Sequence, residues 1–483
     1  MRKAGMLMPV SALPDRHGCG CFGKNAYHFA DLIRQCGISI WQILPLNPLG
    51  YGNSPYQPYS SYAMDEIYIS LDLLEEQGLI ERAPSFHRNA DIVAYETVRN
   101  FKDRYLREAY ANFQKDAAYE AFAGQTWVQN YAVFMTLKKK NGMRCWTEWP
   151  KEDKDILNRG KEALKPYAEE IDYRIFLQYI LFTQWNDLKK YANDRGIEIV
   201  GDLPFYVGLD SADVFANRKC FLLDKDGEPD FIAGVPPDYF AKYGQRWGNP
   251  IYDWDYMEKT KFQFWIERIS YSKKMFDQVR VDHFRAFDTY WKIPSSCPTA
   301  IEGEWIEAPG YALFDELFRQ DPDIRIIAED LGDLRDEVLV LRDHYKFRGM
   351  RVIQFSFNAA GMPADREHLI VYTGTHDNDP ILSWYLSLPN RERRAMRRYL
   401  WNHGYRKHSF SKDIIDYSLD SNADIVIIPI ADWIHAGHEA RLNTPGSVGS
   451  PNWEWRMKDF SRLNSYLDEI TEAVAGSGRR NDL

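Results

Sequence analysis

Residues 278–284 read QVRVDHF, a short β-branched stretch of the kind that buries itself in a parallel sheet. The same stretch carries an arginine, a carboxylate and an imidazole at Arg280, Asp282 and His283. Burying such groups without partners costs several kcal/mol or more. We therefore predict a strand whose charged residues belong to a site.

Seven more stretches along the chain have the composition of buried parallel strands. They are 5–10, 39–46, 197–205, 325–330, 349–355, 369–377 and 423–430. Segments with apolar residues at helical spacing lie between most of these stretches, most clearly at 25–37 and 172–196. Eight strands that alternate with helices predict a (β/α)₈ TIM barrel, and a doubly wound sheet is the competing architecture.

Two connections are too long to be simple crossovers. Residues 47–196 are rich in helix formers, and 206–277 include the Gly- and Pro-rich stretch 234–250. We expect 1–483 to form a single catalytic barrel with a mostly helical insertion at 47–196. The 206–277 insertion, including 234–250, is expected to form a loop over the active-site cleft.

Composition narrows the classes of partner. A net charge of −10 argues against nucleic acid, and no apolar run approaches the ~18 residues that a membrane span needs. The start, MRKAGMLMPV, lacks a long apolar region and a cleavage site, so we expect mature sequence and a cytoplasmic protein. Six cysteines without a CxxC pattern are expected to be reduced thiols.

Carboxylates stand at or near the ends of four predicted strands: Asp202, Asp282, Glu329 and Asp377. In a barrel such ends meet at one mouth. Each carboxylate alone could cap the following helix, but capping does not explain Arg280 inside a strand. Aromatic residues make up 15% of the chain, and they either fill the core or offer faces on which sugar rings stack.

Paired carboxylates in an aromatic site suit cleavage of a glycosidic bond, which needs one ionised and one protonated carboxyl. Arg280 lies two residues before Asp282, hence on the same strand face, and its charge would keep Asp282 ionised. Glu329 follows the apolar run 326–328, and burial would raise its pKa and suit it to the acid role.

Other chemistries find little support. The chain has no GxGxxG after a strand, no GxxxxGK[ST], no HExxH and no GxSxG. His435 and His438, beside Glu439, are spaced for one helix face but lack further ligands. We expect no metal and no cofactor.

Eight blocks, taken together, resemble the amylomaltases, the 4-α-glucanotransferases also called disproportionating enzymes. In order they are GNSPYQPYSSYA (52–63), GDLPFYVG (201–208), GVPPDYFAKYGQRWGNP (234–250), VRVDHFRAF (279–287), YWKIP…TAIEGEWIEAPG (290–310), IAEDLG (327–332), YTGTHDND (372–379) and ARLNTPGS…NWEWR (440–456).

The resemblance implies a barrel related to the α-amylases and a retaining transfer of α-1,4-glucan segments among maltooligosaccharides or to glucose, without a cofactor. It implies that Asp282 is the nucleophile, Glu329 the acid/base and Asp377 a third carboxylate that grips sugar hydroxyls. His283 and His376 would bind the sugar, and Arg280 would orient Asp282. The remaining candidate binding residues are Asp202, Tyr51, Tyr56, Asp238, Trp247 and Asn443.

Three positions depart from the pattern that this family suggests. Arg246 puts a long cation next to Trp247 in the cleft loop, and Pro380 and Ala431 replace residues usual in the family. A looser loop that admits water would give the alternative, an α-amylase-like hydrolase. A glycan-binding protein with a vestigial site is a third reading, but it predicts the loss of a carboxylate, and all three are present.

Overall fold

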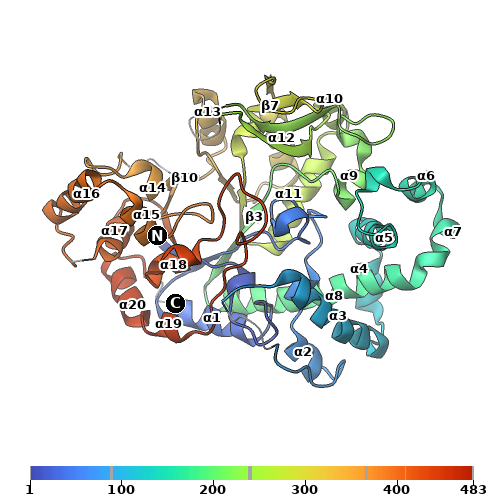
Figure 1. Cartoon of the computed structure of the whole chain (residues 1–483), viewed down its shortest axis with the longest axis horizontal. Coiled ribbons are helices and arrows are strands. Elements are labelled where there is room, and N and C mark those ends of the chain that lie inside the picture. Colours follow the sequence, from blue (N-terminus) through green and yellow to red (C-terminus); the bar gives the residue numbers. More distant parts are fainter. Residues whose placement is uncertain (1, 87–90, 238–241, 365–367, 408, 481–483) are drawn as a thin grey trace.

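Eight parallel strands form the centre of the molecule, and each overlaps a stretch that the sequence predicts (Figure 1). The computed structural model describes residues 2–86, 91–237, 242–364, 368–407 and 409–480. In sheet order the strands are β10 (Gly349–Val352), β11 (Leu369–Tyr372), β12 (Ile425–Pro429), β1 (Lys3–Leu7), β2 (Ile40–Gln42), β3 (Glu198–Leu203), β6 (Gln278–Val281) and β9 (Ile326–Ala328).

The sheet closes on itself between β9 and β10. Ile327 forms a parallel bridge with Arg348, and the Ala328 N–H donates to the Arg348 carbonyl at 2.8 Å. A closed ring of eight parallel strands is the TIM-barrel architecture, so the alternative of an open doubly wound sheet is wrong.

Side chains alternate between the barrel interior and the surrounding helices, as strand geometry requires. In β11, Ile370 and Tyr372 belong to an inner apolar cluster, whereas Leu369 and Val371 pack with the helices. The inner cluster consists of Leu7, Ile40, Val200, Ile327, Met350, Val352, Ile370, Tyr372, Ile425 and Ile427. Val279 and Val281 face the helices, so Arg280 between them points into the barrel.

Helices surround the barrel and form the longer connections between its strands. They are α1 (Lys24–Gln35), α2 (Leu71–Glu76), α3 (Tyr95–Asn112), α4 (Ala117–Ala123), α5 (Thr126–Lys140), α6 (Lys151–Lys154), α7 (Lys161–Leu164), α8 (Ala168–Asp194), α9 (Ala212–Ala216), α10 (Trp254–Lys259), α11 (Gln263–Met275), α12 (Gly310–Gln320), α13 (Asp336–His344), α14 (Ile353–Ser356), α15 (Ile381–Ser387), α16 (Asn390–Asn402), α17 (Phe410–Leu419), α18 (Ile430–Trp433), α19 (Ser461–Asn464) and α20 (Leu467–Gly476).

Strand and helix do not alternate strictly. In the described part of the connection between β10 and β11, only the four-residue α14 is helical. Both helices that the sequence predicts most clearly are present, as α1 and α8. The 47–196 connection is mostly helical, and its helices α5, α6 and α7 lie at the right of Figure 1.

A second, antiparallel sheet stands beside the barrel and is absent from the sequence prediction. Its order is β5 (Gln245–Pro250), β4 (Phe231–Val235), β7 (Thr289–Pro294) and β8 (Glu304–Glu307). The sheet lies at the top of Figure 1. The expected loop of 206–277 therefore contains two strands, β4 and β5, and β4 also pairs with β7 from beyond β6.

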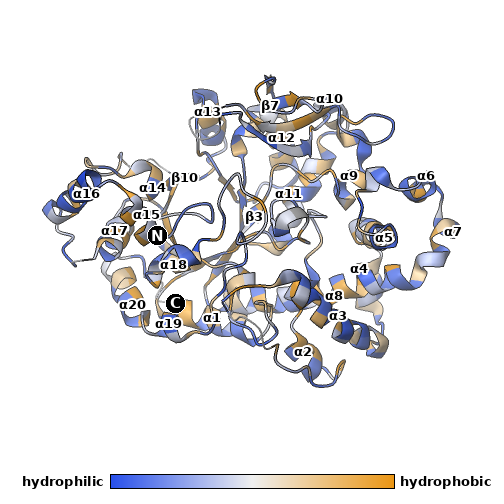
Figure 2. Cartoon of the chain, in the orientation of Figure 1, coloured by the Kyte–Doolittle hydropathy of each residue, from blue (hydrophilic) through white to orange (hydrophobic). Residues whose placement is uncertain are grey.

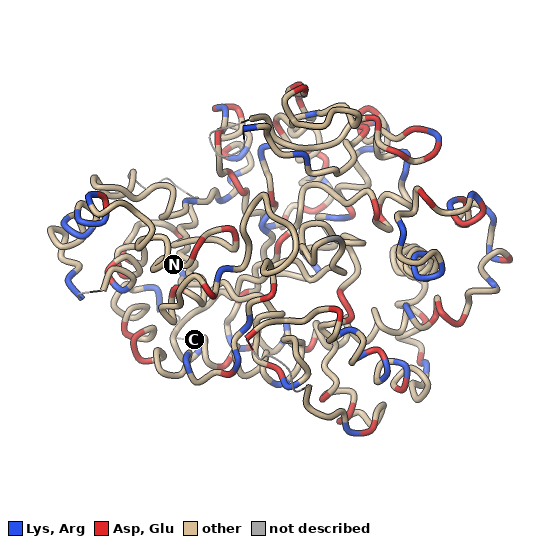
Figure 3. The backbone as a smooth tube through the Cα atoms, in the orientation of Figure 1, with Lys and Arg blue, Asp and Glu red and all other residues tan. Residues whose placement is uncertain are grey.

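Hydrophobic and charged residues are distributed differently between the central barrel and the outer helices. Figure 2 shows hydrophobic residues along the central strands and hydrophilic ones on outer helices such as α16. In Figure 3 acidic and basic residues mix over the molecule, with a local group of basic residues on α16. Within the described residues, no helix combines the length and apolar character needed to cross a bilayer.

Gly201 in β3 gives a test of the packing between barrel and helices. A Cβ atom at this position would lie 2.1 Å from the Phe276 ring, so Gly201→Ala must displace β3 or the ring. Overpacking of this kind costs about 1–3 kcal/mol, and the melting temperature in calorimetry should fall. At Gly476 in α20 a Cβ atom meets nothing within 4 Å, so Gly476→Ala should leave it unchanged or raise it. Equal melting temperatures for Gly201→Ala and the unsubstituted protein would contradict this packing.

Candidate active site

Arg280 is the centre of a buried ion cluster at the carboxyl ends of β3 and β6. It lies directly opposite Asp202 in the strand register, and its Nη1 is 2.8 and 2.7 Å from the two Asp202 oxygens. Its Nη2 donates to Asp282 Oδ1 at 2.9 Å. Burial lowers the pKa of Arg280, but the two carboxylates outweigh burial and raise the pKa well above its ordinary value. The cation is therefore permanent, as the role expected of it requires.

Asp282 is held by its backbone as well as by Arg280. Its N–H donates to the Leu203 carbonyl at 3.0 Å, which continues the β3–β6 ladder beyond the last strand residue. The side chain of Asp282 remains 30% exposed, whereas that of Asp202 is fully buried. Asp282 is thus the carboxylate of this cluster that a bound molecule can reach.

Glu329 lies beside Asp282 at the end of the neighbouring strand β9. Its Oε2 accepts from the His283 N–H at 2.8 Å, and His283 adopts a left-handed backbone with φ of 52°. Burial raises the pKa of Glu329 to about 8; Arg280 opposes this shift and Asp282 adds to it. Glu329 is consequently protonated at neutral pH, as its place after an apolar strand predicts.

Asp377 follows β11 and joins the same site through His376 and Tyr56. The Tyr56 hydroxyl donates to Asp202 Oδ2 at 2.6 Å and lies 3.3 Å from His376 Nδ1, and the two rings stack at 4.9 Å. His376 Nε2 is 3.5 Å from Asp377 Oδ1, which also accepts from Asn443 Nδ2 at 2.6 Å. Polar contacts therefore run without a break from Asp282 to Asp377.

Aromatic rings border the carboxylates on two sides. Trp247 packs edge-on against His283 with ring centroids 4.9 Å apart, and Tyr206 is 6.1 Å from Trp247. Burial lowers the pKa of His283 to about 3, so this imidazole is neutral. On the other side Trp453 lies 5.9 Å from Tyr56 and 5.7 Å from His376.

Sequence reasoning missed Trp453 and Tyr206 as site residues. Both stand inside quoted blocks, NWEWR and GDLPFYVG, so the signal was present. Of the expected residues, Asp238 lies outside the described residues, as does the side chain of Tyr51. The structure brings Asp202, Tyr56, Trp247, Arg280, Asp282, His283, Glu329, His376, Asp377 and Asn443 into one connected group.

Arg246 points away from Trp247. The two are consecutive in β5, so their side chains leave opposite faces of the strand. The Arg246 guanidinium donates to the Ser295 carbonyl at 3.1 Å, within the antiparallel sheet. The expectation that Arg246 would lie beside the indole of Trp247 is therefore wrong.

The histidines weighed as metal ligands point to separate carboxylates. His435 Nε2 is 2.9 Å from Glu469, and His438 Nδ1 is 2.6 Å from Asp379. Across the described part of the chain, no cluster of three or more His, Cys, Asp or Glu residues is arranged to hold a metal ion.

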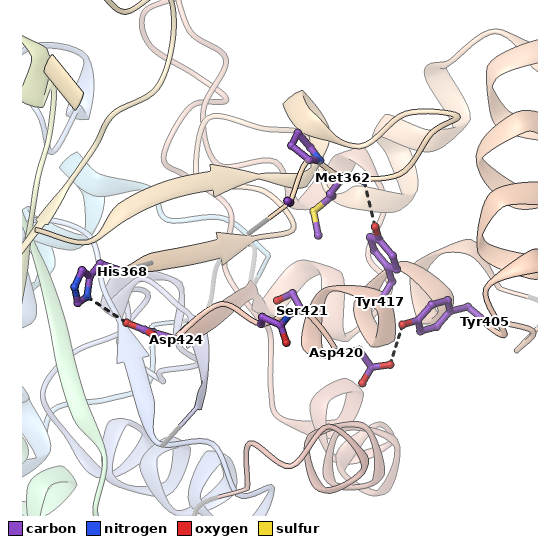
Figure 4. A pocket seen from close by; sticks show the side chains of 10 residues that line it. Met362, His368, Tyr405, Tyr417, Asp420, Ser421 and Asp424 are labelled. Carbon is purple, nitrogen blue, oxygen red and sulfur yellow. Dashed lines mark hydrogen bonds and ion pairs between the residues drawn. The ribbon is translucent and has the colours of Figure 1, made fainter. Parts of the chain in front are cut away.

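A cavity of about 670 Å³ lies at the other end of the barrel (Figure 4). Its walls include His368 and Asp424, which precede β11 and β12, together with Tyr405, Tyr417 and Asp420. Because active sites of TIM barrels lie at the carboxyl ends of the strands, this cavity is distinct from the carboxylate cluster.

Comparison with known proteins agrees with this geometry. A family model described as 4-alpha-glucanotransferase matches residues 8–463. The chain belongs to this 4-alpha-glucanotransferase family. The 4-alpha-glucanotransferase of Aquifex aeolicus (strain VF5) is 40% identical over 483 aligned residues, covering 97% of this chain and 98% of that protein. That of Thermus thermophilus is 40% identical, covering 94% of this chain and 95% of that protein.

Two solved structures of amylomaltases share the fold. An amylomaltase from Streptococcus agalactiae in complex with acarbose superposes with a TM-score of 0.93 at 34% identity, covering 100% of both chains. The Corynebacterium glutamicum amylomaltase matches in fold with a TM-score of 0.77 at 17% identity, over 99% of this chain and 75% of that one.

The two departures Pro380 and Ala431 lie close together, immediately before α15 and in α18. Both line a cavity of about 20 Å³, which also touches Asp379 and Asp432. Asp432 accepts from the Ile381 N–H at 2.6 Å, and its burial raises the pKa to about 6. Pro380 and Ala431 therefore lie near Asp379 and Asp432, and the cavity that they line does not include Asp282, Glu329 or Asp377.

Arg280 allows a direct test of the buried cluster. Arg280→Met leaves Asp202 buried without its cation, which should cost about 3–5 kcal/mol of unfolding free energy in denaturant titrations. Adding Asp202→Asn removes the unpaired charge and should recover part of that loss. Arg319→Met, which removes a surface partner of Glu316, is the control and should change stability little. An Arg280→Met protein as stable as the unsubstituted one would contradict the buried pairing.

Proposed function

We propose that this 4-alpha-glucanotransferase moves α-1,4-glucan segments between maltooligosaccharides, or from them to glucose, by a retaining double displacement. The observation that carries the proposal is the pairing of two unlike carboxyls. Arg280 binds Asp282, and Glu329, one strand away, has a pKa raised to about 8. This division of protonation states is what glycosidic cleavage requires.

In the first step Asp282 attacks the anomeric carbon of the donor. The bond from that carbon to the leaving glucan oxygen breaks, and Glu329 gives its proton to that oxygen. A β-linked glycosyl ester on Asp282 remains. In the second step an acceptor hydroxyl transfers its proton to Glu329 and attacks the same carbon, which restores the α-linkage and both carboxyls.

Binding roles follow from where each side chain lies. Asp377 and His376 are proposed to hold sugar hydroxyls of the cleaved residue, with Tyr56 and Trp453 as flat surfaces beside it. Neutral His283 would donate or accept without competing for the proton of Glu329. Asp202 is proposed to act through Arg280, since its carboxylate is buried and fully engaged.

Transfer wins over hydrolysis only if the acceptor hydroxyl is placed better than water. Good positioning can supply effective molarities of about 10⁵ M or more. Trp247 and the 234–250 segment, with Asp238 and Tyr51 as further expected contacts, are proposed to exclude water and guide the acceptor. Gln57 supports the 234–250 segment, because its Nε2 donates to Asn249 Oδ1 at 3.0 Å and so joins the residues beside Tyr56 to β5.

The proposal treats the whole of 1–483 as one catalytic barrel with insertions at 47–196 and 206–277. It includes a cytoplasmic location, which the six free thiols support because such thiols are typical of reducing compartments. It includes no cofactor and no nucleic-acid partner, in line with the net charge of −10.

Maltotriose separates the competing functions. The protein should convert it to glucose together with a ladder of longer oligomers, with no net gain of reducing ends. Asp282→Asn should abolish both products because no glycosyl ester can form. Reducing ends that rise in step with substrate loss would favour the hydrolase, and an absence of any product would favour a binding protein.

The pH profile tests the role of Glu329. Because its pKa is raised to about 8, the carboxyl stays protonated through neutrality and loses its proton as pH rises through that value. The kcat/KM for maltotriose should therefore fall on the alkaline side near pH 8. With a maltosyl fluoride donor, whose leaving group needs no proton, this alkaline fall should weaken. A profile that is equally steep for both donors would contradict the acid role.

A further inference from the structure

The Asp377 loop, residues 373–380, runs from the end of β11 to the start of α15. Within the loop, Asn378 Oδ1 accepts from the Thr375 N–H at 2.8 Å and from its hydroxyl at 2.9 Å. From outside, Gln354 Nε2 donates to the Asp379 carbonyl at 2.7 Å. These contacts shape the loop but do not reach the carboxylate of Asp377.

Arg441 is the cation that fastens this loop to the segment carrying Asn443. Its Nη1 donates to Asp379 Oδ2 at 2.8 Å and its Nη2 to the Asp377 carbonyl at 3.1 Å. Its Nε donates to the Asn443 carbonyl at 2.8 Å. One guanidinium therefore fixes three groups that belong to the two sides of the same sugar subsite.

Asn443 passes this restraint on to the reacting site. Its Nδ2 donates to Asp377 Oδ1 at 2.6 Å, and its N–H donates to the His376 carbonyl at 3.1 Å. A shift of the Asn443 backbone would therefore move the donor that aims Asp377. Arg441 controls both the carbonyl of Asp377 and the donor to its side chain.

Asp379 is the counter-charge of Arg441. Its Oδ1 also lies 2.6 Å from Nδ1 of the exposed His438, so the carboxylate is held from both ends. Asp377 and Asp379 are separated by one residue, and the Arg441 guanidinium offsets the charge of the Asp379 carboxylate beside Asp377. Without the cation both the anchor and the charge balance of the loop are lost.

We propose that Arg441, paired with Asp379, is a positioning residue that sets Asp377 and Asn443 for transition-state contacts with the sugar. The inference rests on the proposed function, since it deepens the role of Asp377. Lysine cannot replace this arginine fully, because a point charge cannot bind one carboxylate and two carbonyls in a fixed plane.

The test measures kcat and KM for maltotriose disproportionation in Arg441→Ala, Arg441→Lys and Asp379→Asn. Misplacement of about 1 Å at a reacting group can cost roughly 100-fold in rate. We expect Arg441→Ala to lower kcat by about that factor with little change in KM. The kcat of Arg441→Lys should lie between those of Arg441→Ala and the unsubstituted protein. The Arg441 side chain is 20% exposed, so free guanidinium ion can enter the vacated space.

Guanidinium at non-denaturing concentration should restore part of the kcat of Arg441→Ala, whereas sodium chloride at equal ionic strength should not. The matched control is Arg462→Gln, because Arg462 also donates to backbone carbonyls, those of Ile434 and His435, but not to the Asp377 loop. Its kcat should be unchanged.

Two results would overturn the proposal: full kcat in Arg441→Ala, or a loss that tracks the melting temperature and that guanidinium does not rescue. If Arg441→Ala does not fold, Asp379→Asn and Arg441→Lys decide by the same kcat and KM measurements. If the unsubstituted protein forms no transfer products, the proposed function fails instead, so the two failures are distinguishable.

Discussion

The site depends on one constraint, the buried guanidinium of Arg280 between two carboxylates. A TIM barrel fills its interior with apolar side chains, and a charge placed there must find partners within a side-chain length. The parallel register supplies the first partner, because Asp202 of β3 lies directly opposite Arg280 of β6. The second partner, Asp282, lies two residues after Arg280 and directly follows the last residue of β6. The ion cluster thus carries negative charge from the barrel interior to its mouth.

This arrangement gives the neighbouring carboxyls of Asp282 and Glu329 different surroundings. Asp282 receives a cation and remains partly exposed, whereas Glu329 is buried, so its pKa rises to about 8. Arg280 opposes that rise in the pKa of Glu329, and the neighbouring Asp282 adds to it. Tyr56 and His376 extend the polar contacts to Asp377, which brings carboxylates from four separate strand ends, those of β3, β6, β9 and β11, around one site.

Buried parallel strands leave continuous β-branched runs, so all eight barrel strands were predictable, and so was the raised pKa of Glu329 after Ile326–Ala328. The pairing of Arg280 with Asp202 was not, because register between strands is not written in either strand. The antiparallel sheet was missed because QRWGNP and EWIE are short and polar, and because its two hairpins join only where β4 pairs with β7 from a distant part of the chain. Arg441 lies in an irregular segment without periodicity, and only its contacts identify it. The direction of Arg246 required knowing that β5 is a strand.

The most direct test of the account is to trap the ester on Asp282. Glu329→Gln with a maltosyl fluoride donor should form the glycosyl-enzyme, since fluoride leaves without a proton, and should release it slowly, since no base remains to activate an acceptor. Peptide mass spectrometry should then find one maltosyl group on the peptide that contains Asp282, and none in Asp282→Asn/Glu329→Gln. A label on another residue, or turnover without any labelled enzyme, would contradict the account.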